Sequence, residues 1–271
     1  LLKTTRSGAT SIRHREYAVQ IEAEGFLGTY AVHRAADRDR SSSTVVDTAQ
    51  FDALLKTLNV LALTEERKFK EATRALAEVI KQLSSDAGVQ FLEGHLYLLQ
   101  GQAEKGIETV SAAVNTAPDA HGWYLLGIAH LREENHFQAY AALQKSVKLD
   151  PAYAEPWAAL GAILMDRWHN TPAEMRAAVT EELNRVESAL AKIGKDAFGL
   201  VELRIQRLAA KGERSKAIAL GAEALNLFPK RSTLHLLMSE LREADGEIAQ
   251  MERHLERAAE VDPDDAEPLM R

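Results

Sequence analysis

The hydrophobic positions of this chain change their period near residue 50. Upstream, Tyr17, Val19 and Ile21 alternate with small or polar residues, and this period of two predicts a strand with one buried face. A second short strand is expected at 29–33, after two glycines. From Phe51 onward, apolar residues recur every three or four positions, which predicts a series of amphipathic helices. The pattern therefore predicts a mainly helical chain with a short β-containing N-terminal segment.

Two neighbouring segments, 87–119 and 120–153, repeat the same order of small, aromatic and proline positions. Trp123 recurs as Trp157, 34 residues further along the chain. The positions that carry the pattern are Trp123, Leu126, Gly127, Ala139, Leu143 and Pro151 in one copy, and Gly94, Tyr97, Gly106, Val110, Ala113 and Pro118 in the copy before it. This pattern resembles that of the tetratricopeptide repeat (TPR) family, whose unit is a helix–turn–helix of about 34 residues.

The resemblance implies an all-α fold for most of the chain, a right-handed superhelix of about six TPR-like hairpins. This repeat domain is expected to fill residues 46–271, and residues 1–45 are expected to form a β-hairpin-like segment and a linker. The hairpins are predicted near residues 53–86, 87–119, 120–153, 154–197, 198–231 and 232–265.

Small residues recur where the two helices of a hairpin are expected to cross, because larger side chains would separate the helices. They are Ala72, Gly106, Ala139, Ala173 and Ala217. The step between the hairpins that start at 154 and 198 is 44 residues instead of 34. Since the stretch from 173 to 193 is rich in helix formers, the insertion is predicted to lengthen the second helix of that hairpin.

Composition narrows the classes of function. The net charge of −7 argues against binding to nucleic acid, and no apolar run reaches the length of a transmembrane helix. The chain has no cysteine, which excludes disulfides and thiolate metal sites and is compatible with either the cytoplasm or the periplasmic side of a bacterial cell envelope. Because the sequence begins at Leu1, a signal peptide or anchor could precede it.

Catalytic and metal-binding motifs are missing from the sequence. It contains no Gly-rich phosphate loop, no nucleophile elbow and no His-Glu-x-x-His pair. The Glu-x-x-His spacing of Glu133 and His136 falls in a turn between predicted helices, and His254 is expected on an exposed helical face. We therefore expect no catalytic residue, no metal site and no cofactor, and we do not expect this chain to be an enzyme.

The TPR resemblance implies that the first helices of successive hairpins line a concave groove that binds peptides or helices of other proteins. By register, the partner-binding residues would be Phe91, His95, Leu98, Leu99, Tyr124, Ile128, Leu131, Arg132, Met165 and Asp166. The alternative for Phe91, Tyr124 and Leu131 is that they belong to the core, because the groove lies only one helical row from buried positions. An apolar groove favours a partner with a hydrophobic or amphipathic helical anchor. Further along, the same face becomes polar at Glu202, Gln206, Glu240 and Glu243.

The resulting hypothesis is a non-enzymatic scaffold or assembly factor for protein–protein interaction, and its cysteine-free, alanine- and arginine-rich composition is typical of bacterial proteins. Two alternatives remain open. The protein could be a structural homo-oligomeric component whose groove is filled by its own residues 1–45, or the chain could be the interaction domain of a larger enzyme.

Overall fold

The computed structural model describes residues 9–14, 17–23, 30–34, 56–57, 59–64, 66–83, 87–194 and 197–261. These residues divide into two compact units, Leu1–Ser146 and Val147–Arg271.

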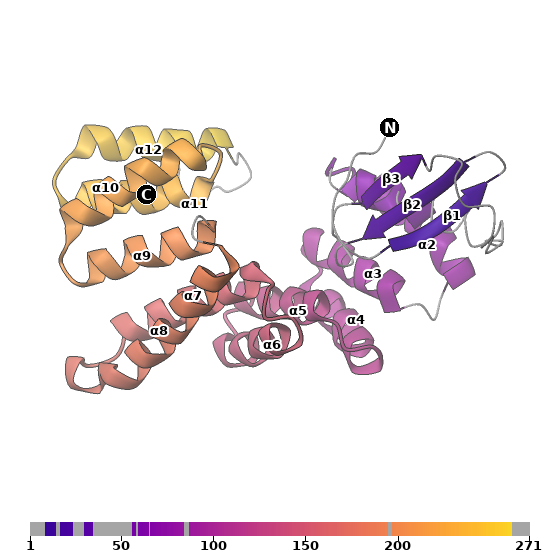
Figure 1. The fold of residues 1–271 in the computed structure, drawn as a ribbon, viewed down its shortest axis with the longest axis horizontal. Helices are drawn as coiled ribbons and strands as arrows, with labels where there is room; N and C mark the ends of the chain where they lie inside the picture. The colour runs from indigo at the N-terminus through magenta and orange to yellow at the C-terminus, as the bar shows by residue number, and fades with distance from the viewer. Residues whose placement is uncertain are drawn as a thin grey trace. The chain divides into compact units, whose positions relative to one another are not determined.

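Unit 1 begins with a three-stranded antiparallel sheet of strand order β1-β2-β3 (Figure 1). Its strands are β1 (Ala9–His14), β2 (Tyr17–Ala23) and β3 (Tyr30–Arg34). In the register, Ile12 pairs with Val19, and Ile21 pairs with Val32. The linker predicted between the strands and the first helix lies outside the described residues.

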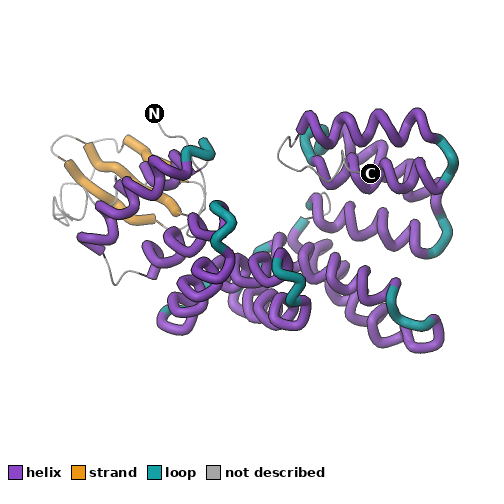
Figure 2. The backbone as a smooth tube through the Cα atoms, turned by 180° about the vertical axis from the view of Figure 1, so that it is seen from behind, coloured by secondary structure: helices purple, strands orange, loops and turns teal. Residues whose placement is uncertain are grey.

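From residue 56 onward the described chain is all-helical, and short loops join its antiparallel helices (Figure 2). In unit 1, helical residues 59–64 precede five complete helices. These are α2 (Phe69–Leu83), α3 (Ala87–Leu99), α4 (Ala103–Thr116), α5 (Ala120–Arg132) and α6 (His136–Leu149). In unit 2 the helices are α7 (Ala154–His169), the 3₁₀ turn η1 (Ala173–Met175), α8 (Arg176–Ile193), α9 (Phe198–Ala210), α10 (Arg214–Leu227), α11 (Ser232–Ala244) and α12 (Ile248–Val261).

Glycine allows the helices of the α3–α4 hairpin to touch. A Cβ atom at Gly106 would lie 2.6 Å from the Leu98 side chain, and one at Gly94 would lie 2.5 Å from Val110. Ala72, Ala139 and Ala217 are likewise completely buried. The small residues therefore set how closely the paired helices approach, as close packing requires.

The turn inside most hairpins needs a residue with left-handed backbone. Gly101, Gly212 and Gly246 have φ angles of 74°, 77° and 76°, and Arg67 and Glu134 adopt φ angles of 58° and 57° in the matching turns. Glycine suits this conformation because it has no Cβ to clash with the neighbouring carbonyl group.

The insertion in unit 2 is shared by both helices of the α7–α8 hairpin, so the prediction that only the second helix is lengthened was wrong. Helix α7 has 16 residues where α5 has 13, and α8 has 18 where α6 has 14. The three residues of η1 complete the insertion. Because α7 stays helical at the position where the other hairpins turn, the tip of this hairpin extends by about one helical turn, roughly 5 Å.

The same insertion corrects the crossing residue predicted in this hairpin. Ala173 is exposed in η1, whereas Leu183, ten residues further along, is buried in α8. Counted back from the end of the second helix, Leu183 occupies the position that Ala139 has in α6.

Candidate partner-binding surface

The first helices α3 and α5 contact each other, and both also pack against α4. Eight of the ten predicted partner-binding residues lie on these two helices. Six of them are half-buried, Arg132 is exposed and Phe91 is buried; the half-buried ones are His95, Leu98, Leu99, Tyr124, Ile128 and Leu131.

Phe91 belongs to the core, which corrects its assignment to the groove. Its side chain is only 3% exposed and packs in a cluster with Val110, Val114 and Leu125. A Cβ atom at Gly122 would lie 2.6 Å from the Phe91 ring, so the glycine leaves space for the aromatic side chain. A helical period does not distinguish a buried row from a neighbouring half-exposed row, and Phe91 falls on the buried side.

Two further predicted residues are on α7, in unit 2. Met165 is 4% exposed and therefore also belongs to the core, which removes it as a contact for a partner. Asp166 is exposed, and its backbone carbonyl accepts a hydrogen bond of 3.0 Å from the side chain of Asn170. Both residues belong to unit 2, whereas α3 and α5 belong to unit 1, so the contact of Asp166 with a partner stays a prediction.

Leu98 is used partly inside its own hairpin, because its side chain lies over Gly106 of α4. The residues that remain form the α3–α5 surface, which we define as His95, Leu99, Tyr124, Ile128, Leu131 and Arg132. This surface is mostly apolar, with an aromatic ring and a single cation.

His95 is the electrostatically perturbed member of the α3–α5 surface. Burial lowers the pKa of its imidazole to about 4, and the nearby positive charges of His121 and Arg132 act in the same direction. Its Nδ1 atom is buried and has no hydrogen-bond partner among the described residues. The imidazole is therefore neutral at pH 7 and adds a polar but uncharged group to the surface.

The groups around His95 also include an aromatic contact. His121, at the start of α5, lies with its ring centroid 6.1 Å from that of Tyr124. Burial lowers the pKa of His121, although the carboxylate of Asp119 opposes this shift. The rings of His121 and Tyr124 are both partly buried. This end of the α3–α5 surface is therefore less polar than its histidine content suggests.

The polar residues predicted further along the chain lie on α9 and α11 in unit 2. Glu202 and Gln206 are half-buried, and Glu240 and Glu243 are exposed. Burial raises the pKa of the Glu202 carboxyl, and the positive charge of Arg231 opposes this shift. Glu202 therefore holds a carboxylate in a partly dry position.

A histidine pair joins α11 and α12, although His254 was predicted to be exposed. The Nδ1 atoms of His235 and His254 are 3.3 Å apart, and Nε2 of His235 is 3.3 Å from the carbonyl oxygen of Pro229. Burial lowers the pKa of His254, as do the charges of His235 and Arg242. Sequence periodicity missed this contact because the two rings come from helices whose relative rotation it does not specify.

Within the described ranges, no three His, Asp or Glu side chains are placed to share a metal ion. No helix in the described part of the chain is long and apolar enough to cross a membrane.

Comparison with known proteins agrees with the repeat pattern. The family model of the tetratricopeptide repeat matches residues 120–153, which contain the α5–α6 hairpin. Residues 120–153 are therefore a tetratricopeptide repeat. The helices of the chain have the fold of solved TPR proteins. The thermophilic TPR protein TTC0263 of Thermus thermophilus superposes with a TM-score of 0.59 at 19% identity, covering 69% of this chain and 96% of that protein. A TPR protein from Parabacteroides merdae gives a TM-score of 0.63 at 15% identity, covering 80% of this chain and 81% of its own.

A curated relative is the cell division cycle protein 27 homolog of Caenorhabditis elegans, which is 28% identical over 87 residues. This match covers 32% of the present chain and 11% of the relative. The match thus spans about a tenth of that protein.

Proposed function

We propose that this TPR protein is a non-enzymatic scaffold or assembly factor that binds a peptide segment or amphipathic helix of a partner on the α3–α5 surface. TPR proteins are generally scaffolds for protein–protein interaction. The observation that carries the proposal is the row of half-buried apolar side chains on the first helices of two adjacent hairpins, above all Tyr124, Ile128 and Leu131 on α5, with Leu99 on α3.

The partly buried state of these side chains suits them for binding. Tyr124 and Leu131 are already held by the packing of α5, so they lose little conformational freedom when a partner covers them. Covering the rest of such a side chain contributes roughly 25 cal/mol for each Å² of apolar area removed from water. A few anchors of this kind commonly supply most of the affinity of an interface.

The charges on the α3–α5 surface favour an apolar anchor over an acidic one. Arg132 is its one cation, and His95 adds no charge near neutral pH because its imidazole is held neutral. We therefore expect the partner to place aliphatic or aromatic side chains against Tyr124 and Leu131.

The experiment is an affinity capture from extracts of the source organism, read by mass spectrometry, with the intact chain and a Tyr124→Ala/Leu131→Glu variant side by side. We expect a partner that is recovered by the intact chain and lost with the variant. Direct binding of that purified partner, measured by titration calorimetry, should weaken at least about tenfold in the variant.

Phe137→Ala is the matched control, because Phe137 is an aromatic residue that is 83% exposed on α6 of the same unit. This variant should capture the same partner as the intact chain. Equal capture by the Tyr124/Leu131 variant would contradict the proposal. Loss of helical circular dichroism in that variant would instead assign Tyr124 and Leu131 to the core, and a change in its oligomeric state would identify a second copy of the chain as the occupant.

A further inference from the structure

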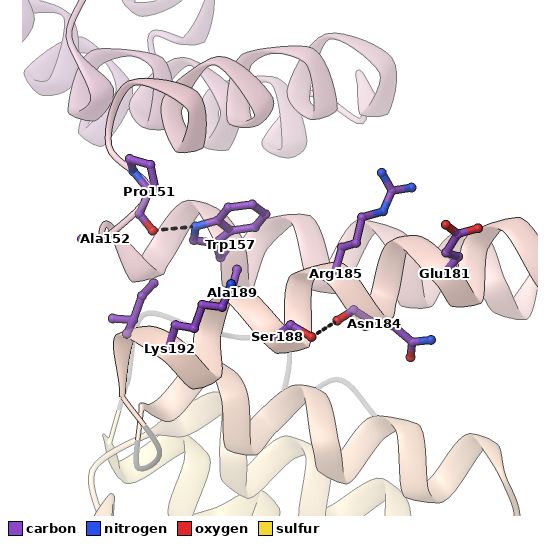
Figure 3. A pocket seen from close by; sticks show the side chains of 10 residues that line it. Pro151, Ala152, Trp157, Glu181, Asn184, Arg185, Ser188, Ala189 and Lys192 are labelled. Carbon is purple, nitrogen blue, oxygen red and sulfur yellow. Dashed lines mark hydrogen bonds between the residues drawn. The ribbon is translucent and has the colours of Figure 1, made fainter.

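The α7–α8 hairpin of unit 2 carries a pocket of about 680 Å³ (Figure 3). This volume lies in the range of pockets that hold small molecules or single peptide side chains. Its apolar part is formed by Pro151, Trp157, Ala189 and Ile193, and its polar part includes Glu181, Arg185 and Lys192. All of these residues belong to unit 2.

Trp157 is fixed in place but keeps part of its indole open. Its Nε1 atom donates a hydrogen bond of 3.1 Å to the carbonyl oxygen of Pro151, which fixes the orientation of the ring (Figure 3). Among the described residues no cation stacks on this ring, and its side chain is only half-buried. The indole therefore presents a rigid apolar surface to the pocket.

In the preceding hairpin, α5–α6, a lysine side chain covers the tryptophan that is equivalent to Trp157. Trp123 lies three residues after the start of α5, and Trp157 lies three residues after the start of α7. Lys145 covers Trp123, because its Nζ lies 3.8 Å from the centroid of the indole ring. Lys145 comes four residues before the end of α6, and Ala189 holds that position in α8. Replacement of the covering lysine by alanine thus leaves Trp157 open.

The polar side of the pocket carries two cations without partners. Arg185 and Lys192 form no hydrogen bond or ion pair within the described residues, although both lie on the same face of α8. They are seven residues apart, which places them roughly 10 Å from each other along the helix. Glu181 lies one turn before Arg185 and limits the positive region at that end.

We propose that this pocket binds an acidic peptide segment of a partner protein, with an apolar side chain on the indole of Trp157 and carboxylates on Arg185 and Lys192. The charge of the cations and the open ring together select this chemistry, since an unpaired cation gains a charge-assisted hydrogen bond from a carboxylate. An extended peptide advances about 3.3 Å per residue, so two acidic residues three positions apart span the two cations. The apolar residue lies between them.

The test uses a fluorescein-labelled peptide, Ser-Gly-Glu-Phe-Ala-Glu-Gly-Ser, titrated with the full chain and followed by fluorescence anisotropy. We expect saturable binding that weakens at least about tenfold in an Arg185→Ala/Lys192→Ala variant and that falls with added salt. A peptide with glycine in place of phenylalanine should lose a similar factor.

The decisive variant is Ala189→Lys, which restores the lysine that covers Trp123 in the preceding hairpin. It adds a positive charge to the pocket but covers the indole, so binding should weaken at least about tenfold despite the more favourable charge. Arg253→Ala is the matched control, because Arg253 is an exposed cation on α12 with no ion pair among the described residues. It removes one positive charge from a residue that does not line the pocket, half of the charge removed by Arg185→Ala/Lys192→Ala, and should leave affinity within about twofold.

Equal or tighter binding by Ala189→Lys would overturn the proposal, because the peptide would then be held by charge alone. No binding of the peptide to the intact chain would overturn it as well. Each variant is first compared with the intact chain by circular dichroism. None of these substitutions touches the α3–α5 surface, so the two proposals can fail independently.

Discussion

The neutral imidazole of His95 makes the stability of unit 1 depend on pH. In the unfolded chain the ring has its ordinary pKa of 6.5, whereas in the folded chain burial and the charges of His121 and Arg132 lower this pKa to about 4. Below pH 6.5 the unfolded state therefore binds a proton that the folded state does not bind. Stability is fully present above the unfolded pKa, is lost as pH falls through this window, and levels off below about pH 4.

The magnitude follows from the two pKa values. At pH 5 most unfolded molecules are protonated at this ring and few folded molecules are, which costs about 2 kcal/mol of unfolding free energy relative to pH 7. His95→Gln keeps a neutral polar side chain of similar length but does not titrate. We expect the intact chain to lose about 2 kcal/mol more than this variant between pH 7 and pH 5.

The assay is urea unfolding followed by far-ultraviolet circular dichroism at pH 7, 6 and 5, with the variant and the intact chain in parallel. Taking the difference between the two proteins cancels the titration of carboxylates, which both contain. His136→Gln is the control, since His136 is exposed at the start of α6. An equal pH dependence of the intact chain and His95→Gln would refute the reasoning, because it would mean that the His95 ring keeps its water in the folded state.

Two packing predictions complete the set. Ala139→Leu should reduce the free energy of unfolding, measured in urea, by about 1–3 kcal/mol, because Ala139 is completely buried at the α5–α6 crossing. Ala141→Leu, at a half-buried position of the same helix, should cost less. Gly221→Ala should destabilise by about 1 kcal/mol, because its new methyl group would overlap the sulfur of the buried Met238 in α11, and the better helix propensity of alanine offsets only part of this overlap. Ala222→Leu, at an exposed position of α10, should leave the midpoint of a thermal melt nearly unchanged, and equal melting of the two variants would contradict the packing described here.

The repeat family was predictable because its signals are local and recur. The 34-residue spacing of Trp123 and Trp157 reflects a requirement that every hairpin repeats, and so do the small residues Gly106 and Ala139 at the helix crossings. The prolines also recur at fixed positions. Pro118, Pro151 and Pro229 each lie two residues beyond a helix end, where the missing N–H of proline costs no helical hydrogen bond.

The candidate surface was predictable only in part. Register placed His95 and Tyr124 on the first helices, but it also placed Phe91 and Met165 there as contacts, and both are core residues. A small rotation of a helix about its axis is enough to exchange a half-exposed row of side chains for a buried one. This rotation depends on how α3 and α7 pack against neighbouring helices. A glycine such as Gly122 decides the outcome, because it admits the Phe91 ring.

The hairpin unit, its period and its helical class could all be predicted from the amino-acid pattern, because they depend on contacts between residues close together in the chain. The division of the ten inserted residues between α7, η1 and α8 could not be predicted in this way, and neither could the side-chain contacts between helices. The open indole of Trp157 and the pairing of His235 with His254 are of this second kind. Such contacts depend on the rotation and spacing of neighbouring helices, and the free energy that sets these comes from packing the whole unit at once.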